Sequence, residues 1–245
     1  MARLLSVKDL AKYLGLSERT VYKMVKAGDI PVLRIGGQFR FRQEQIDEWL
    51  KSGPGKTPDF ALSRIENTKD QLTRRLLFVA LLTKALEPER IRPVIVGGNA
   101  VEFYTAGGYT TGDIDVVAPS EPIDKVLARW GFRKQGRHWI SEKLDIFIEA
   151  PSSSLNKEQM ERVSEVEIDD LKVYVLGIED LIIDRLNACV HWKSSDDGRW
   201  AKELMALHAG EIDWTYLEDR TKEEETHNVF RQTKKDLGLD EENQI

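Results

Sequence analysis

Cysteine, histidine and long apolar runs are all scarce in this sequence, and each scarcity excludes a class of protein. Cys189 is the only cysteine among 245 residues, which excludes an internal disulfide and a zinc site built from several cysteines. The four histidines are scattered without the spacing of metal ligands. No apolar run reaches the roughly 18 residues that a membrane helix needs, and the amino-terminal segment does not have the pattern of a signal peptide. We therefore expect a cytoplasmic protein that does not contact membranes.

The charge of the chain is divided unevenly along its length. The net charge is -6, and hydrophobic residues make up 41% of a chain long enough for one large domain or two modest ones. Residues 1–50 hold nine Lys and Arg against six Asp and Glu, a net charge of +3, which leaves -9 for the remaining 195 residues. A basic head on an acidic body indicates that the head alone meets a polyanion.

The basic head has the pattern of two short helices. Ser6 is a suitable N-cap for the first helix, and Gly15 ends it. Ser17 caps a second helix over residues 18–26, which Gly28 ends. Two helices joined by a short turn that contains glycine form a helix-turn-helix.

A hairpin and a closing helix follow these two helices. Residues 30–42 are typical of a hairpin around Gly36-Gly37, and residues 43–50 have the apolar spacing of a helix. The outward face of the second helix and the hairpin carry the residue types that reach base edges and phosphates. The candidate DNA-binding residues are Arg19, Thr20, Lys23, Lys26, Arg34, Arg40 and Arg42.

Residues 4–50 resemble the winged helix-turn-helix of excisionase and MerR-type proteins. The matching segments are Ser6-Val-Lys-Asp-Leu-Ala, Leu16-Ser-Glu-Arg-Thr-Val-Tyr, Gly28-Asp-Ile-Pro, Arg40-Phe-Arg and Ile46-Asp-Glu-Trp-Leu50. The resemblance implies binding of double-stranded DNA, with the second helix in the major groove and the hairpin on the backbone. Because one head makes few contacts, a homodimer or several copies would be needed for useful specificity. A module that contacts protein on the same scaffold is the alternative.

The body begins after a segment rich in glycine and proline. We assign residues 1–50 to the head, 51–60 to a linker, 61–220 to the body and 221–245 to a charged last helix that frays. Within the body, the patterns predict one helix over residues 61–86 and another over 123–130, with strands between and after them. The fold class that we expect is α+β with two domains.

The segment 94–117 carries the strongest chemical signal in the body. Residues 94–96 have the pattern of a buried strand, and two glycines then bring the backbone close to the start of a helix. The free N–H groups and the positive dipole of such a helix start suit a phosphate. The candidate nucleotide-binding residues are therefore Gly97, Gly98 and Asn99.

Two aspartates follow on the next predicted strand. Asp113 and Asp115 lie two residues apart, so their side chains share one face of the strand. Two adjacent carboxylates repel each other unless a cation lies between them, and oxygen ligands of this kind suit Mg²⁺ together with substrate phosphates. A phosphate site followed by a metal-binding pair indicates nucleotidyl transfer.

The same segment resembles the nucleotidyltransferase superfamily related to DNA polymerase β. The matching residues are Val96-Gly97-Gly98 and Asp113-Ile114-Asp115, and the nearest resemblance is to the abortive-infection and toxin–antitoxin branch. This resemblance implies a mixed β-sheet flanked by helices, with a third carboxylate on a neighbouring strand that completes the metal site and accepts a proton. Asp145, on a strand expected over residues 144–149, is the matching position, and Glu149 is the second candidate.

Three functions remain open from the sequence. The first is transfer of a nucleotidyl group from a nucleoside triphosphate to an unknown acceptor, with Mg²⁺ held by Asp113, Asp115 and Asp145. The second is a DNA-binding regulator whose nucleotidyltransferase fold senses a nucleotide or a partner without catalysis. The third, suggested by the resemblance alone, is the antitoxin-like half of a two-gene system with a small helical partner protein.

Overall fold

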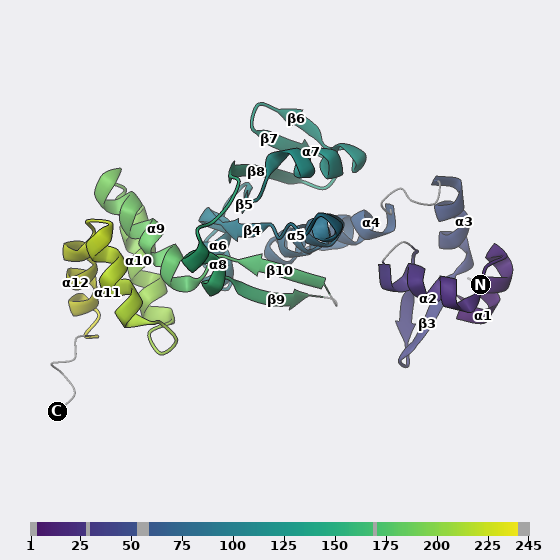
Figure 1. Ribbon diagram of the computed structural model, residues 1–245, viewed down its shortest axis with the longest axis horizontal. Coiled ribbons are helices and arrows are strands. Elements are labelled where there is room, and N and C mark those ends of the chain that lie inside the picture. The colour runs from purple at the N-terminus through teal and green to yellow at the C-terminus, as the bar shows by residue number, and fades with distance from the viewer. Residues whose placement is uncertain (1–3, 28–29, 53–58, 169–170, 240–245) are drawn as a thin grey trace.

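The chain folds around two separate sheets. The computed structural model describes residues 4–27, 30–52, 59–168 and 171–239. The head holds a three-stranded sheet in the order β1-β3-β2, and the body holds a seven-stranded sheet in the order β6-β7-β8-β5-β4-β10-β9. The head lies at one end of the molecule and the C-terminal helices at the other, with the large sheet between them (Figure 1). Each region has its own cluster of buried apolar side chains, which confirms the expected α+β class.

The head has the winged helix-turn-helix arrangement that the sequence predicts. Its elements are β1 (Leu4–Leu5), α1 (Val7–Leu14), α2 (Glu18–Ala27), β2 (Leu33–Ile35), β3 (Gln38–Arg42) and α3 (Gln43–Ser52). Ser6 caps α1 as expected, since its hydroxyl accepts from Asp9 N at 3.2 Å while Ser6 N donates to Asp9 Oδ2 at 3.0 Å. Strand β1, which pairs with β3, was not predicted. The predicted helix end at Gly28 lies outside the described residues.

The large sheet places β5 between β4 and β8. The strands are β4 (Val94–Val96), β5 (Ile114–Val117), β6 (Arg133–Gln135), β7 (His138–Ser141), β8 (Ile146–Ser152), β9 (Ser164–Ile168) and β10 (Leu171–Val175). Strand β5 runs antiparallel to β4, with Asp115 opposite Val96. It runs parallel to β8, with Asp115 opposite Glu149. This register sets which carboxylates can meet on the face of the sheet.

The helices of the body differ from the prediction at its start. They are α4 (Asp59–Asn67), α5 (Gln71–Leu86), α6 (Gly97–Tyr104), α7 (Ser120–Arg129), α8 (Lys157–Arg162), α9 (Ile178–His191), α10 (Ser195–Leu207), α11 (Trp214–Glu223) and α12 (His227–Asp236). The single helix predicted over residues 61–86 is wrong, because the polar stretch 68–70 separates α4 from α5. Asp70 caps the second of these helices by accepting from Thr73 N at 2.7 Å.

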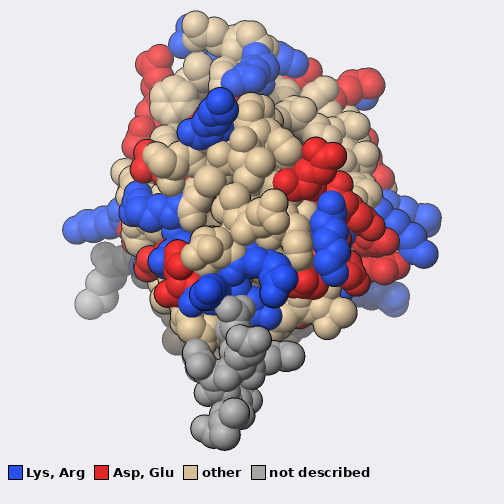
Figure 2. All heavy atoms as spheres, turned by 90° about the vertical axis from the view of Figure 1, so that its left-hand side faces the viewer, with Lys and Arg blue, Asp and Glu red and all other residues tan. Residues whose placement is uncertain are grey.

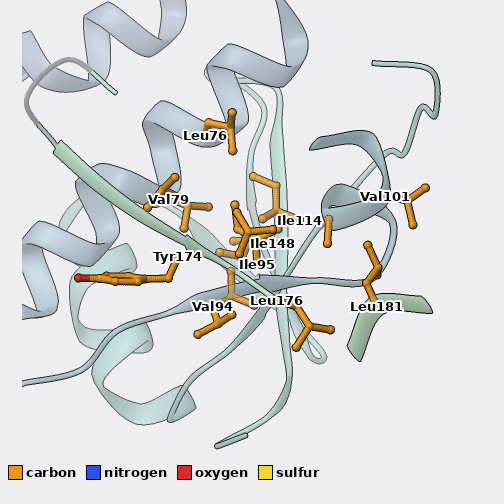
Figure 3. Close-up of a cluster of buried hydrophobic side chains, with 14 of the residues drawn as sticks. Leu76, Val79, Val94, Ile95, Val101, Ile114, Ile148, Tyr174, Leu176 and Leu181 are labelled. Carbon is orange, nitrogen blue, oxygen red and sulfur yellow. The ribbon is translucent and has the colours of Figure 1, made fainter. Parts of the chain in front are cut away.

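The core of the body lies where α5 and α9 pack against the sheet. Figure 3 shows Leu76 and Val79 of α5 beside Ile95, Ile114 and Ile148 from three neighbouring strands. All of these side chains are at most 9% exposed. Because β4, β5 and β8 are anchored from this side, the residues at their ends are held on a rigid frame.

The C-terminal helices form one packed unit. The sequence predicts a fraying helix from residue 221, but Phe230 of α12 is fully buried and lies 6.4 Å from Trp214 of α11, centre to centre. On the face that these helices present, Lys and Arg are interspersed with Asp and Glu (Figure 2). No helix in the described part of the chain is long and apolar enough to cross a membrane. The predicted linker falls mainly on residues 53–58, which lie outside the described ranges.

Candidate functional site

The start of α6 meets the carboxylate of Asp115. Gly97 has a φ of 59°, and a Cβ atom at this position would lie 2.6 Å from Asp115 Oδ2. Glycine is therefore required here both by the backbone conformation and by the approach of the carboxylate. No side chain caps the helix, whose N-cap is Val96. The first turn of α6 thus presents backbone N–H groups beside an acidic side chain, as predicted from the glycine pair.

Asp113 is held by side chains that the sequence does not single out for this role. Asn99 is 2% exposed, and its Nδ2 donates to the carbonyl oxygen of Asp113. Thr111 Oγ1 donates to Asp113 Oδ1 at 3.2 Å. The side chain of Asn99, predicted to bind nucleotide, is therefore used to hold the start of β5. The role of Thr111 has no signal in the sequence beyond its position two residues before the aspartate.

Glu149 lies beside Asp115, whereas Asp145 does not lie on the strand. The prediction of a strand that includes Asp145 is wrong: β8 begins at Ile146, and Asp145 occupies the preceding turn with a φ of 52°. Its side chain is 63% exposed and pairs with Arg74 at 3.7 Å. Glu149 is 7% exposed. Its backbone lies opposite that of Asp115 in the parallel pairing of β5 and β8.

Two basic side chains next to Glu149 complete this part of the site. Arg137 Nε lies 2.8 Å and His138 Nδ1 lies 3.2 Å from Glu149 Oε2. Glu149 Oε2 has no hydrogen-bond partner among the described residues, so neither contact is a hydrogen bond. The Arg137 contact is an ion pair, whereas the His138 contact carries charge only when the imidazole is protonated. The register of β5 and β8 brings Glu149 level with Asp115.

The electrostatics of the site centre on Asp115. Burial raises the pKa of its carboxyl group from 3.8 to about 6, with further contributions from the charges of Asp113 and Glu149, while Arg185 and Arg137 oppose the rise. Arg185 comes from α9, is 16% exposed and donates to Asp197 Oδ1 at 2.6 Å. The site is thus acidic, with the guanidinium of Arg185 as one of the charges that offset it.

The carboxylates fit a magnesium ion that arrives with a phosphate ligand. Among the described residues, no group of three or more His, Cys, Asp and Glu side chains is arranged to hold a metal ion. Asp115 lies on β5, whereas Asp113, predicted on the same strand, lies in the bend just before it, and its charge helps to raise the pKa of Asp115. Mg²⁺ is usually held by one or two carboxylates plus substrate phosphates. The donor set therefore fits a metal ion whose coordination is completed by substrate.

The raised pKa of Asp115 predicts that Asp115→Asn stabilises the protein in neutral solution. The carboxyl has a pKa of about 6 when folded and about 3.8 when unfolded, so its ionised form destabilises the fold above pH 6 and the cost disappears below pH 4. Each pKa unit corresponds to about 1.4 kcal/mol, so the gain at pH 8 is at most about 3 kcal/mol, less what water screens.

Urea denaturation of the wild type and Asp115→Asn between pH 4.5 and 8 measures this gain. The stability difference should grow with pH through 6, whereas Asp145→Asn, at an exposed position, should show little difference at any pH. A gain that does not change with pH would contradict the assignment.

The head presents some of its predicted DNA-binding residues to solvent. Arg19, Lys23 and Lys26 of α2 are exposed. Thr20 instead is tied to the start of its own helix, with its Oγ1 2.8 Å from Ser17 Oγ. The carbonyl oxygen of Lys26 also accepts from Lys84 Nζ of α5 at 3.1 Å, so the end of α2 contacts the body.

The three arginines of the hairpin differ in their exposure and contacts. Arg42 is exposed, while Arg40 donates to the carbonyl oxygen of Phe39 at 2.9 Å and to Gln38 Oε1 at 2.5 Å. Arg34 is exposed and its guanidinium lies 5.5 Å from the centre of the Phe39 ring. The register pairs Arg34 with Phe39 and Leu33 with Arg40, so Arg34 lies on one face of the hairpin and Arg40 and Arg42 on the other.

Two known families match separate parts of the chain. The family described as nucleotidyltransferase of unknown function (DUF6036) matches residues 75–238. The chain belongs to this family. A second family, described as a helix-turn-helix domain, matches residues 4–54. The family assignment confirms the nucleotidyltransferase fold of the body and the helix-turn-helix of the head.

Individual relatives extend the comparison. Two candidate DNA-binding proteins of Mycobacterium tuberculosis, MT0521 and Rv0500A, are each 32% identical to this chain over 50 residues, which is 20% of this chain and 64% of theirs. An antigenic nucleotidyltransferase-like protein from Paracoccidioides brasiliensis has a similar structure, with a TM-score of 0.50 and 16% identity, over 70% of this chain and 92% of that one. The solution structure of the antibiotic-resistance factor ANT(2'')-Ia has a TM-score of 0.43 and 17% identity, over 69% and 95% of the two chains.

Proposed function

We propose that this member of the family is a DNA-binding protein that transfers a nucleotidyl group from a nucleoside triphosphate to an acceptor, with Mg²⁺ as cofactor. The observation that supports this most directly is the contact between the start of α6 and Asp115. An uncapped helix start, suited to phosphate, lies beside a carboxylate pair suited to Mg²⁺. These are the two components that a triphosphate bound to magnesium requires.

Each group of the site has a role in this proposal. The backbone N–H groups that begin with Gly98 and Asn99 bind the phosphates, and Asp113 and Asp115 hold the metal. Bound Mg²⁺ stabilises the charge that develops on the phosphoryl oxygens. In place of Asp145, we propose Glu149 as the third carboxylate, because β8 brings it level with Asp115.

Transfer is tested with triphosphates labelled at the α-phosphate. The wild type is incubated with Mg²⁺ and each labelled triphosphate, and label is sought on nucleic acid, on protein and on small molecules. In parallel, the affinity for Mn²⁺ is measured with and without Asp113→Ala in the presence of a non-hydrolysable triphosphate. The proposal is lost if no label is transferred and the variant binds Mn²⁺ as well as the wild type does.

A regulator without catalysis is the second candidate. The observation that favours it is the ion pair of Glu149 with Arg137, which already neutralises one carboxylate of the site. Titration with a triphosphate, with and without Mg²⁺, separates the candidates, since binding without turnover favours the regulator. A small helical partner, suggested for the antitoxin-like alternative, would be detected by co-purification.

The DNA-binding part of the proposal rests on the exposed basic face of α2. Residues at such positions reach phosphates and base edges when the second helix enters the major groove. A homodimer would place two heads on adjacent half-sites, which would compensate for the small contact surface of one head.

Lys23→Ala is expected to weaken DNA binding about tenfold and to reduce the salt dependence of the affinity by about one ion. The reason is that Lys23 is exposed on α2, where loss of a phosphate contact releases one counterion fewer. Fluorescence anisotropy with duplex DNA at several salt concentrations measures both quantities. Lys157→Ala, which removes an equal charge from α8 of the body, is the matched control and should bind as the wild type does. Equal affinities for wild type and Lys23→Ala would place the DNA contact elsewhere.

A further inference from the structure

Arg75 is a buried cation of α5 with three separate acceptors. It is 7% exposed. Its Nη1 donates to Glu102 Oε2 at 2.6 Å, and its Nη2 donates to the carbonyl oxygen of Thr111 at 2.5 Å and to Gln71 Oε1 at 3.1 Å. Glu102 comes from α6 and is 4% exposed, so the charges of the pair balance each other away from water.

Thr111 connects this guanidinium to both halves of the proposed site. Its Oγ1 donates to Asp113 Oδ1 at 3.2 Å. Its Cβ lies 3.1 Å from the position that a Cβ of Gly98 would occupy, so Thr111 also borders the start of α6. A shift of Thr111 would therefore move one metal-binding carboxylate and one wall of the phosphate site together.

The connection that contains Thr111 is hydrogen-bonded to itself and to α6 over residues 105–109, before the contacts of Thr111. Residues 105–112 form turns and bends between α6 and β5 and include three glycines. Gly107 and Ala106 both have positive φ, at 86° and 49°. Glycine-rich turns gain backbone freedom when a tertiary contact is removed. The bond from Arg75 restrains the last part of this segment just before Asp113.

We propose that Arg75 is a positioning residue that sets the carboxylate of Asp113 and the phosphate site through Thr111. This inference rests on the proposed function, because the positioning matters only if the site binds metal and phosphate. The contacts of Arg75 are independent of that function. The planar guanidinium can bind Glu102 with one nitrogen and Thr111 with the other. A lysine at this position keeps the charge and the pair with Glu102, but it loses the second arm of the fork.

The test compares Arg75→Lys with Arg74→Lys in the full chain. Arg74 is its neighbour on α5 and pairs with Asp145, outside the proposed site. The first measurement is hydrogen exchange of the amides in residues 105–113 without ligand. The second is affinity for the Mn²⁺ complexes of non-hydrolysable ATP, GTP, CTP and UTP analogues, using those that the wild type binds.

In Arg75→Lys, we expect exchange in residues 105–113 to rise about tenfold while the strands of the large sheet stay protected, and analogue affinity to fall about tenfold. Arg74→Lys should match the wild type in both measurements. If Arg75→Lys does not fold, Arg75→Ala is measured with and without millimolar guanidinium, which should restore protection in this segment. Unchanged exchange in residues 105–113, or a rise shared by the whole body, overturns the inference.

The two measurements also separate this inference from the proposed function. If the wild type binds none of the four analogues, the proposed function fails and hydrogen exchange alone decides the role of Arg75. If the analogues bind equally well to the wild type and Arg75→Lys, the positioning role is wrong while the proposed function stands.

Discussion

Asp115→Asn should lower the rate of nucleotidyl transfer about 1,000-fold. The carboxylate contributes to charge stabilisation through the metal in the transition state, and loss of about 4 kcal/mol corresponds to this factor. The rate is measured with the α-labelled triphosphate and acceptor that the wild type uses. Because the same variant is expected to be more stable at neutral pH, unfolding cannot account for the loss.

The third carboxylate is identified by a companion pair of variants. Glu149→Gln should lower the rate about 100-fold or more, which is typical for loss of a group that moves a proton or holds the metal. Asp145→Asn should stay within about twofold of the wild type, because this side chain is exposed in a turn and pairs with Arg74. The reverse result would return Asp145 to the site and show that the turn before β8 rearranges when substrate binds.

The local features of the site could be predicted because each depends on residues close in sequence. A short apolar run, two glycines and a following helix specify the strand and the helix start of the proposed phosphate site. The strand that carries Asp115 was also predicted, although it begins at Ile114, one residue after Asp113. In the head, the Ser6 cap and the hairpin could also be predicted, because both are formed by residues close in sequence.

The features that could not be predicted depend on register or on distant contacts. Asp145 and Glu149 have the same parity along the predicted strand, so alternation places both on one face. Only the pairing of β5 with β8 shows that Glu149 is level with Asp115, and β8 begins one residue after Asp145. The contacts of Asn99 and Arg75 likewise join residues that the sequence separates by 14 and 36 positions.

Three other predictions missed a strand, a helix boundary or the packing of a helix. Strand β1 has two residues, too few to show alternation, and exists because it pairs with β3. The break between α4 and α5 depends on the cap at Asp70. The apolar spacing around this cap led to the prediction of one continuous helix. Burial of Phe230 depends on α11, a helix that the sequence did not suggest. For β1 and Phe230 a tertiary contact overrides a local pattern, whereas the break at Asp70 is set by a local cap.

Gly97→Ala should reduce transfer about 100-fold and weaken binding of the triphosphate analogues. The added Cβ would lie 2.6 Å from Asp115 Oδ2, and the φ of 59° is unfavourable for alanine. Either the carboxylate or the start of α6 must move, and a displacement of about 1 Å in a catalytic group can cost about 100-fold in rate. Rates and analogue affinities are measured together with thermal stability.

Gly112→Ala is the matched control for this change. It adds the same methyl group just before β5, in the connection from α6, but a Cβ at Gly112 would meet no atom within 4 Å. Its rate should stay within about twofold of the wild type. If Gly97→Ala is as active as Gly112→Ala, the start of α6 does not need to approach Asp115 during the reaction, and the phosphate site must be sought elsewhere on the sheet. If only Gly97→Ala loses both activity and analogue binding while it remains folded, the contact between helix start and carboxylate is the structural basis of the proposed activity.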